Sequence, residues 1–133
     1  LEPNRVEYPP INTKLFYNKK IRRTQTLVYV GSNGGDTKSA GIQEIINKLK
    51  KDKKRIAILG NSHYLNKNLI NGCKVLTNLS DQELANEYNK SAEVYAPQVW
   101  EPYGYVVAEA KACGCQIIVK PYGGPREILN DNK

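Results

Sequence analysis

Long apolar runs are absent from this 133-residue sequence. No stretch approaches the ~18–20 consecutive apolar residues that a membrane-spanning helix needs, and no signal peptide is visible. The composition, with 40% hydrophobic and 25% charged residues, is typical of a soluble globular protein. A chain of this length predicts one domain of ordinary size, which can bury a core without disulfide bonds.

Cysteine is also scarce, with Cys73, Cys113 and Cys115 in the whole chain. An odd count does not form a framework of disulfide pairs. Cys113 and Cys115 flank one glycine, and the sequence offers no second pair of ligands for zinc. We interpret all three as reduced, partly buried thiols, which predicts a cytoplasmic protein.

Acidic residues are fewer than basic ones: 13 Asp and Glu stand against 20 Lys and Arg, giving a net charge of +7. The basic residues cluster at positions 19–23 and 48–55. Such clusters attract phosphates, whether of a nucleotide, a nucleic acid or an anionic membrane surface. For the second cluster we favour the solvated C-terminal end of a helix, where lysines complement the helix dipole. We expect no nucleic-acid partner, because aromatic residues are not interleaved with the basic ones at a groove-reading spacing.

Two common glycine motifs for nucleotides are missing as well. The loop GSNGGD, residues 31–36, has neither G-x-G-x-x-G spacing nor the G-K-[ST] ending of a P-loop. It does follow a predicted strand, and Lys38 stands at the start of the next predicted helix. Backbone N–H groups and a cation at such a place favour phosphate binding, although glycines at a turn are more often there for their conformation alone.

What the sequence does contain is a regular alternation of strand and helix. Short apolar runs predict buried strands at residues 26–30, 55–60, 73–76, 93–97 and 115–120. Helices are predicted at residues 39–51, 80–92, 106–113 and 126–131. Ser80 and Glu83 match the capping box of a helix start, and Gly114 is placed to end the third helix. The order predicts an α/β fold, with a Rossmann-like parallel sheet of about five strands and helices on both faces.

Residues 1–25 are predicted to be an entry segment, since three prolines prevent a regular start, and residues 26–133 to be the domain itself. Residues 61–71 are polar and are predicted to be a loop. In parallel sheets, ligands bind beyond the carboxyl ends of the strands. The loops predicted at that edge span residues 31–38, 60–71, 77–79, 97–104 and 121–124.

The stretch WEPYGYVVAEA holds two glutamates, Glu101 and Glu109, eight positions apart. Gly104 lets the backbone approach a ligand, and Tyr105 and Val106 would expose N–H groups at a helix N-terminus, which favours an anion. Glu109 follows an apolar run and is predicted to be partly enclosed, where ribose hydroxyls could satisfy its carboxylate. The alternative is a pair of ordinary surface glutamates, one of them offsetting a nearby lysine.

A third glycine-bearing turn, PYGGPRE, follows the last predicted strand. Gly123 and Gly124 would bring backbone close to a ligand at the same edge. A tight turn that closes the last β–α unit explains them equally well.

Residues 79–129 closely resemble the C-terminal domain of retaining glycosyltransferases with the GT-B fold, the glycosyl transferases group 1 family. The resemblance rests on motifs that follow one another in a fixed order. The E-x7-E pattern begins at the glutamate of EPYG and ends at the glutamate of EA, and ACG, a buried strand and GGPRE follow. Upstream, YPPINTKLF is similar to the segment that joins the two GT-B domains, and VYVGS to the family's first strand and phosphate loop. The likeness covers nearly the whole chain and implies one half of a GT-B fold.

The resemblance implies a site for a nucleotide-sugar donor. In it, Glu101 would contact hydroxyls of the transferred sugar and Glu109 the ribose hydroxyls, while Lys38 would neutralise the diphosphate. Backbone groups would line the diphosphate and the cleft at Gly31, Ser32, Gly104, Tyr105, Val106, Gly123 and Gly124. The loop that begins at Val75 would lie close to the base.

The sequence departs from the family pattern at three places. Ser32 stands where an arginine often follows the first-strand glycine, and Lys38 is followed by Ser39 and Ala40 where a glycine is common. The family's last strand and the helix that crosses back are not reached. The N-terminal acceptor domain is missing, with its histidine, and His63 lies in a polar loop that does not suit that role.

The sequence therefore predicts the donor-binding domain of a hexosyltransferase that uses a UDP- or GDP-sugar and needs no metal and no other cofactor. We expect the fragment to be inactive without its N-terminal acceptor-binding domain. A lipid-linked acceptor or a peripheral membrane surface is a further candidate partner. The alternatives are a non-catalytic nucleotide-sugar-binding module and a nucleotide-sugar epimerase of GT-B architecture.

Overall fold

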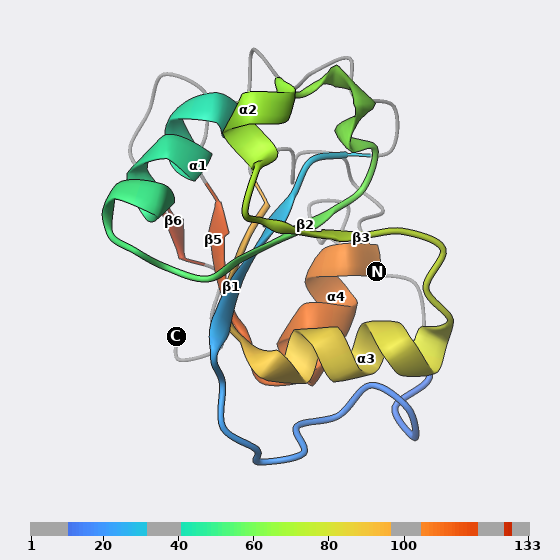
Figure 1. Cartoon of the computed structure of the whole chain (residues 1–133). Coiled ribbons are helices and arrows are strands. Elements are labelled where there is room, and N and C mark those ends of the chain that lie inside the picture. Colours follow the sequence, from blue (N-terminus) through green and yellow to red (C-terminus); the bar gives the residue numbers. More distant parts are fainter. Residues whose placement is uncertain (1–10, 32–40, 97–104, 120–126, 129–133) are drawn as a thin grey trace, which may run out of the picture.

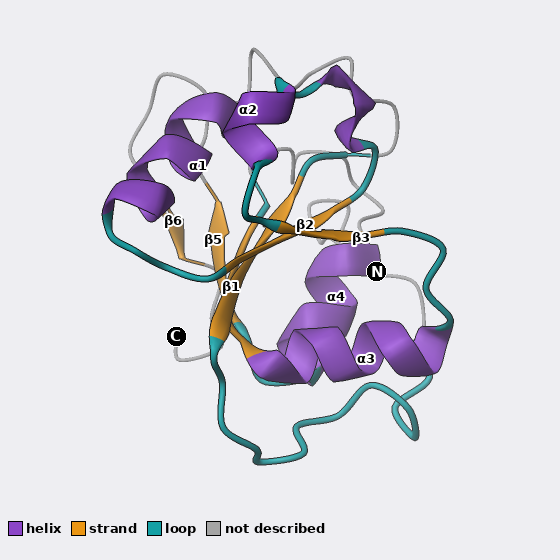
Figure 2. Ribbon diagram, in the orientation of Figure 1, coloured by secondary structure: helices purple, strands orange, loops and turns teal. Residues whose placement is uncertain are grey.

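Six strands form one sheet in the order β3-β2-β1-β4-β5-β6 (Figure 1). The computed structural model describes residues 11–31, 41–96, 105–119 and 127–128. The strands are β1 Gln25–Tyr29, β2 Ile56–Leu59, β3 Lys74–Leu76, β4 Ser91–Tyr95, β5 Gln116–Val119 and β6 Glu127–Ile128. The helices are α1 Ile42–Lys51, the 3-10 turn η1 Ser62–Tyr64, α2 Lys67–Ile70, α3 Asp81–Lys90 and α4 Tyr105–Ala112 (Figure 2).

The predicted parallel sheet is confirmed for β1 to β5, whose pairings are all parallel. Their cores are short apolar runs, and such strands are covered on both sides in α/β proteins. The central strand shows this well, because Leu27 and Val28 point to opposite faces and both are fully buried.

The prediction of a last helix over residues 126–131 is wrong at its described positions. Glu127–Ile128 forms β6, which pairs antiparallel with β5 and matches Ile118 with Ile128. The open edge of β5 offers unpaired backbone groups, and satisfying them outweighs the weak helical preference of so short a segment.

The loop predicted over residues 61–71 contains two short helical turns, η1 and α2. The side chain of Asn61 accepts a hydrogen bond from the His63 N–H, and that of Asn66 accepts one from the Asn68 N–H. These are N-cap bonds that a purely polar loop would not need. Leu65 is buried between the two turns, so this segment belongs to the core.

The predicted capping box at the start of α3 and the predicted glycine after α4 are confirmed. The predicted end of the helix over residues 80–92 is wrong, because α3 ends at Lys90 and residues 91–92 already belong to β4. At α3 the Ser80 hydroxyl accepts from the Glu83 N–H at 3.1 Å, while the Glu83 carboxylate accepts from the Ser80 N–H at 2.8 Å. This is the complete capping box. After α4, Gly114 takes a left-handed φ of 94°, as a residue ending a helix often does.

The helices cover the sheet in two layers, as predicted: α1 and α2 lie over one face, and α3 and α4 over the other (Figure 1). The α1/α2 layer packs on alternate positions of β1 and β2, such as Val28 and Ile58. The α3/α4 layer packs on the intervening positions, such as Leu27 and Ala57. Among the helices in the described part of the chain, none combines the length and apolar character needed to cross a bilayer.

Residues 11–24 run beneath α3 and pack against it (Figure 1). Phe16 is 3% exposed, and its ring centroid lies 6.1 Å from that of Tyr88. The Arg23 guanidinium donates to the carbonyls of Ser91 at 2.9 Å and Cys113 at 2.6 Å. This end of the predicted linker is therefore bonded to the domain through both α3 and the end of α4.

All three cysteines are free thiols, as predicted. Cys113 and Cys115 are buried, and burial raises the pKa of the first to about 11 and of the second to about 12. The Arg23 charge opposes this shift at both sites without cancelling it. Both thiols thus stay protonated near neutral pH and serve as packing groups.

Candidate functional site

The carboxyl ends of β1 to β5 meet at one edge of the sheet, where α/β proteins bind ligands. At this edge the ends of β1 and β2 touch. The Asn61 N–H donates to the Gly31 carbonyl at 2.9 Å. A Cβ on Gly60 would lie 2.5 Å from that same oxygen, and Gly60 has a φ of 116°. Position 60 therefore requires glycine. Gly31, which is predicted to lie at the phosphate loop, is fixed by the hydrogen bond that its carbonyl accepts from Asn61.

A hollow of about 650 Å³ lies beyond the ends of β2 and β3. Its lining residues are Leu59, Gly60, Asn61, Ser62, His63, Val75, Leu76, Thr77 and Asn78. Val75, predicted to lie near the base, keeps 38% of its surface exposed and faces this space. An apolar side chain with polar amides and hydroxyls around it suits a flat heterocycle with polar edges.

Sequence reasoning placed residues 60–71 at this edge of the sheet but named no site residue among Asn61, Ser62 and His63, which line the hollow after β2. The His63 side chain is exposed and also lines the hollow. The available signal was their position directly after Gly60, at the carboxyl end of a parallel strand.

Glu109 lies in the second turn of α4 and is half-buried. The Tyr88 hydroxyl donates a hydrogen bond to Glu109 Oε1 at 3.3 Å. Burial raises the pKa of the Glu109 carboxyl to about 6; the Tyr88 bond lowers it and the charge of Asp81 adds to the rise. The predicted partial enclosure of Glu109 is confirmed. It does not behave as an ordinary surface glutamate, because the loss of water around it outweighs its one hydrogen bond.

Asp81 acts on Glu109 through its charge. It is the first residue of α3, three positions after Asn78, which lines the hollow. Its charge adds to the rise in the pKa of the Glu109 carboxyl on α4.

Tyr105 and Val106 open α4, as the sequence predicts. The first N–H groups of an α-helix have no partner within the helix, and together with the helix dipole they attract an anion. The helix follows β4, so this terminus lies at the carboxyl edge of the sheet. The backbone groups predicted to hold a diphosphate are thus on the same side as the hollow.

The remaining predicted site residues lie outside the described residues. These are Ser32, Lys38, Glu101, Gly104, Gly123 and Gly124. Their roles stay predictions.

Comparison with known proteins decides the family. The glycosyl transferases group 1 family matches residues 18–133, most of the chain. The chain belongs to this family.

Relatives of this glycosyltransferase chain include larger proteins. A probable sucrose-phosphate synthase of Thermosipho melanesiensis is 39% identical over 64 residues, which cover 45% of the chain and 15% of that protein. The chain therefore spans a small part of this relative.

Two solved structures share the fold of the glycosyltransferase chain. Sucrose-phosphate synthase from Thermosynechococcus elongatus gives a TM-score of 0.60 at 22% identity, over 86% of this chain and 34% of that one. The C-terminal domain of a glycosyl transferase group 1 family protein (LpcC) from Francisella tularensis gives 0.60 at 20% identity, over 86% and 72%. The predicted α/β, Rossmann-like fold is thus confirmed.

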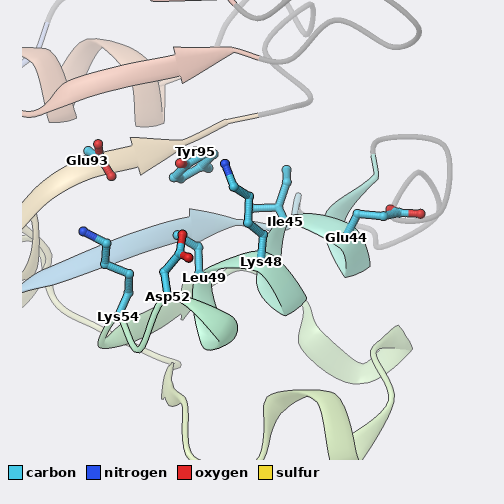
Figure 3. Close-up of a pocket in the computed structure, with 8 residues that line it drawn as sticks. All are labelled: Glu44, Ile45, Lys48, Leu49, Asp52, Lys54, Glu93 and Tyr95. Carbon is cyan, nitrogen blue, oxygen red and sulfur yellow. The ribbon is translucent and has the colours of Figure 1, made fainter.

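A second hollow of the glycosyltransferase chain, about 360 Å³, lies between α1 and β4 (Figure 3). Acidic and basic side chains share its lining with apolar ones: Glu44, Ile45, Lys48, Leu49, Asp52, Lys54, Glu93 and Tyr95. None of the predicted site residues is among them. Within the described ranges, no three His, Cys, Asp or Glu side chains gather closely enough to hold a metal ion.

Proposed function

We propose that this chain is the donor-binding domain of a retaining hexosyltransferase, which transfers a sugar from a UDP- or GDP-sugar to an acceptor hydroxyl. Membership of the glycosyl transferases group 1 family supports the sugar-transfer chemistry. The observation that supports the donor role is the half-buried Glu109 carboxylate. It accepts a hydrogen bond from the Tyr88 hydroxyl, and it lies on α4, which begins at the carboxyl edge of the sheet. An enclosed carboxylate needs hydroxyl partners, and a ribose offers two.

The proposed placement of the nucleotide follows the carboxyl edge of the sheet. The base would occupy the β2/β3 hollow beside Val75, and the ribose would donate its hydroxyls to Glu109. The diphosphate would accept from the N–H groups at Tyr105 and Val106. Glu101 would receive hydroxyls of the transferred sugar.

Charge builds up on the diphosphate as the glycosidic bond breaks. Helix-terminal amides and the Lys38 ammonium would stabilise that charge more in the transition state than in the ground state, which is how such a site accelerates transfer. Fixed dipoles and one cation supply this stabilisation in our proposal, so transfer is expected to proceed without a metal ion. The acceptor would be held by an N-terminal domain of the parent enzyme, and the chain alone is expected to transfer no sugar.

Titration calorimetry of the full chain with UDP, GDP and their sugars tests the proposal. Weak binding of at least one nucleotide is expected, with Glu109→Ala reducing affinity for the plain nucleotide at least tenfold. Glu101→Ala should reduce only the extra affinity that the sugar provides. If the folded chain binds none of these ligands, the donor role is wrong. Equal losses with plain nucleotide for both variants would contradict the assigned roles.

The basic residues at 48–55 lie at and just after the end of α1 and are exposed, as expected for a solvated helix end. The same charge would allow a peripheral membrane surface as a further partner. All lysines and the arginine of this stretch are exposed, and each basic residue near an anionic bilayer contributes ~1 kcal/mol of attraction. A cytoplasmic location, as proposed from the reduced thiols, would expose this surface to the anionic leaflet. Co-sedimentation with phosphatidylserine vesicles at low and high salt tests it; absence of binding at low salt would exclude this partner.

A further inference from the structure

We propose that Tyr88 is a positioning residue of the nucleotide site: its buried hydroxyl holds the Glu109 carboxylate in the orientation that accepts the ribose hydroxyls of a nucleoside diphosphate. The inference rests on the proposed function. Tyr88 would touch no part of the nucleotide and would act only through Glu109.

The hydroxyl of Tyr88 is the first argument. The side chain is 0% exposed, and Glu109 is the partner to which its hydroxyl donates, at 3.3 Å between Oη and Oε1. A buried hydroxyl without a partner costs free energy that a phenyl ring would not. Tyrosine at this position is therefore explained by the carboxylate on the neighbouring helix, and packing of the ring alone does not require it.

Tyr88 is itself fixed from several sides. Its ring packs against Phe16, with the two planes inclined by 51°. Its backbone carbonyl accepts from Arg23 Nη1 at 3.2 Å and from the Cys115 thiol at 3.0 Å. Glu109, by contrast, is half-buried and has a flexible side chain. A rigid donor beside a flexible carboxylate reduces the conformations that the carboxylate must lose on binding a ligand.

The charges around Glu109 come from both helices of this layer. In the described part of the chain, Tyr88 and Asp81 face it from α3, and Cys113 faces it from the end of α4. Burial and Asp81 raise the pKa of the Glu109 carboxyl to about 6, while the Tyr88 bond lowers it. Burial raises the pKa of Tyr88 far above its usual value, so that its hydroxyl remains a donor at every working pH.

It follows that loss of the Tyr88 hydroxyl has two effects on Glu109. The carboxylate becomes free to turn, and it takes up its proton at a higher pH. A protonated carboxyl has fewer acceptor sites for ribose hydroxyls. Nucleotide affinity should therefore fall most steeply at mildly acidic pH.

The experiment measures nucleotide affinity of the full chain by calorimetry between pH 5.5 and 8.5, using whichever of UDP and GDP the wild type binds. Tyr88→Phe keeps the ring and removes the hydroxyl. Phe16→Leu disturbs the same packing and keeps the hydroxyl. Thermal melts at each pH ensure that every variant is compared while folded. The wild type should lose affinity as the pH falls through about 6.

In Tyr88→Phe, the loss of nucleotide affinity with falling pH should occur at a pH at least half a unit higher. Binding should be about three- to tenfold weaker than in the wild type at pH 6.5, with a smaller difference at pH 8.5. Phe16→Leu should leave the pH profile in place. In a Glu109→Ala background, which removes the acceptor of the Tyr88 hydroxyl, Tyr88→Phe should change nothing further. A Tyr88→Phe profile parallel to the wild type, or one matched by Phe16→Leu, would overturn the inference.

The titration of Glu109 in the free chain separates this inference from the proposed function. The carboxyl carbon of Glu109, followed by NMR in the absence of ligand, should titrate at higher pH in Tyr88→Phe. If no nucleotide binds the wild type but this shift appears, the contact stands and the ribose role is wrong. If the nucleotide binds through Glu109 but no shift appears in either measurement, the positioning role is wrong.

Discussion

The two layers that cover the sheet are built from different chemistry. In the part of the chain that the structure describes, the buried hydrophobic side chains of the α1/α2 layer are aliphatic: Val28, Val30, Ile42, Ile45, Ile46, Leu49, Ile56, Ile58 and Leu65. The α3/α4 layer also contains Phe16, Tyr88 and two cysteines, and the polar side chain of Asn89 is fully buried beneath it. The bond that joins the two helices of the first layer, from Lys50 to the Leu69 carbonyl, is exposed, whereas the second layer contains buried hydrogen bonds.

The hydrogen bonds of the α3/α4 layer tie separate segments together. Asn89 donates to the carbonyls of Tyr17 and Ala85 at 3.0 Å each and accepts from the Lys19 N–H at 2.8 Å. Glu109, the carboxylate of the candidate site, is held by the same layer. A polar core of this kind specifies one arrangement of its parts, and the nucleotide site that we propose would need that precision.

The largest expected loss of stability comes from a substitution in the aliphatic α1/α2 layer. Ile46→Ala removes a fully buried side chain and should lower the free energy of unfolding by about 3–4 kcal/mol. Chemical denaturation measures this, with the exposed Gln43→Ala on the same helix as the control. Nucleotide affinity of the folded fraction should not change. A tenfold loss of affinity would mean that the two layers are not separate in function.

The next effect is on the polar core. Asn89→Ala leaves the Lys19 N–H and the Tyr17 carbonyl without their partner and should cost about 2–3 kcal/mol. Asn86→Ala, three positions earlier on the exposed side of α3, removes only exposed hydrogen bonds, from the Lys19 ammonium and the Gln82 amide, and should cost less than ~0.5 kcal/mol. Similar losses for both would show that the linker segment contributes little through Asn89.

The helix starts differ between the layers as well. α3 begins with a capping box, whereas α1 begins at Gly41 with no side-chain cap. Ser80→Ala should therefore lower stability by about 1 kcal/mol, and Ser80→Asp should restore most of it. Thermal denaturation of the three proteins measures the difference. No loss for Ser80→Ala would mean that tertiary packing alone fixes the start of α3.

The smallest expected effect is a gain in the free energy of unfolding, where the earlier substitutions cause a loss. The folded-state pKa of Glu109 is raised to about 6, above its unfolded value, so the charged carboxylate opposes folding above pH 6 and this penalty is relieved as the pH falls from about 6 to 4.5. Glu109→Gln should then raise stability at pH 8 by a few tenths of a kcal/mol, since the group is half-exposed, and by nothing at pH 4.5. Chemical denaturation of both proteins at pH 8 and at pH 4.5 measures the difference.

The sequence predicted the parts of the structure that depend on local patterns. Continuous apolar runs located the five parallel strands, and the S-x-x-E pattern located the start of α3. The edge strand β6 was missed, because its pairing with β5 is a property of the assembled sheet. The Tyr88–Glu109 bond was missed for a similar reason: the two residues lie on different helices, 21 positions apart, and meet only when α3 and α4 pack.

The position of β1 in the sheet has a consequence for the order of folding. β1 lies between β2 and β4, although α1, β2, α2, β3 and α3 separate it from β4 along the chain. Closing so long a loop costs entropy before the β1–β4 pairing can return any stability, so the β1-α1-β2 half is expected to form first. Val94→Ala should then accelerate unfolding with little effect on the folding rate, while Ile58→Val should slow folding. The edge that carries α4 and Glu109 is therefore expected to fold last.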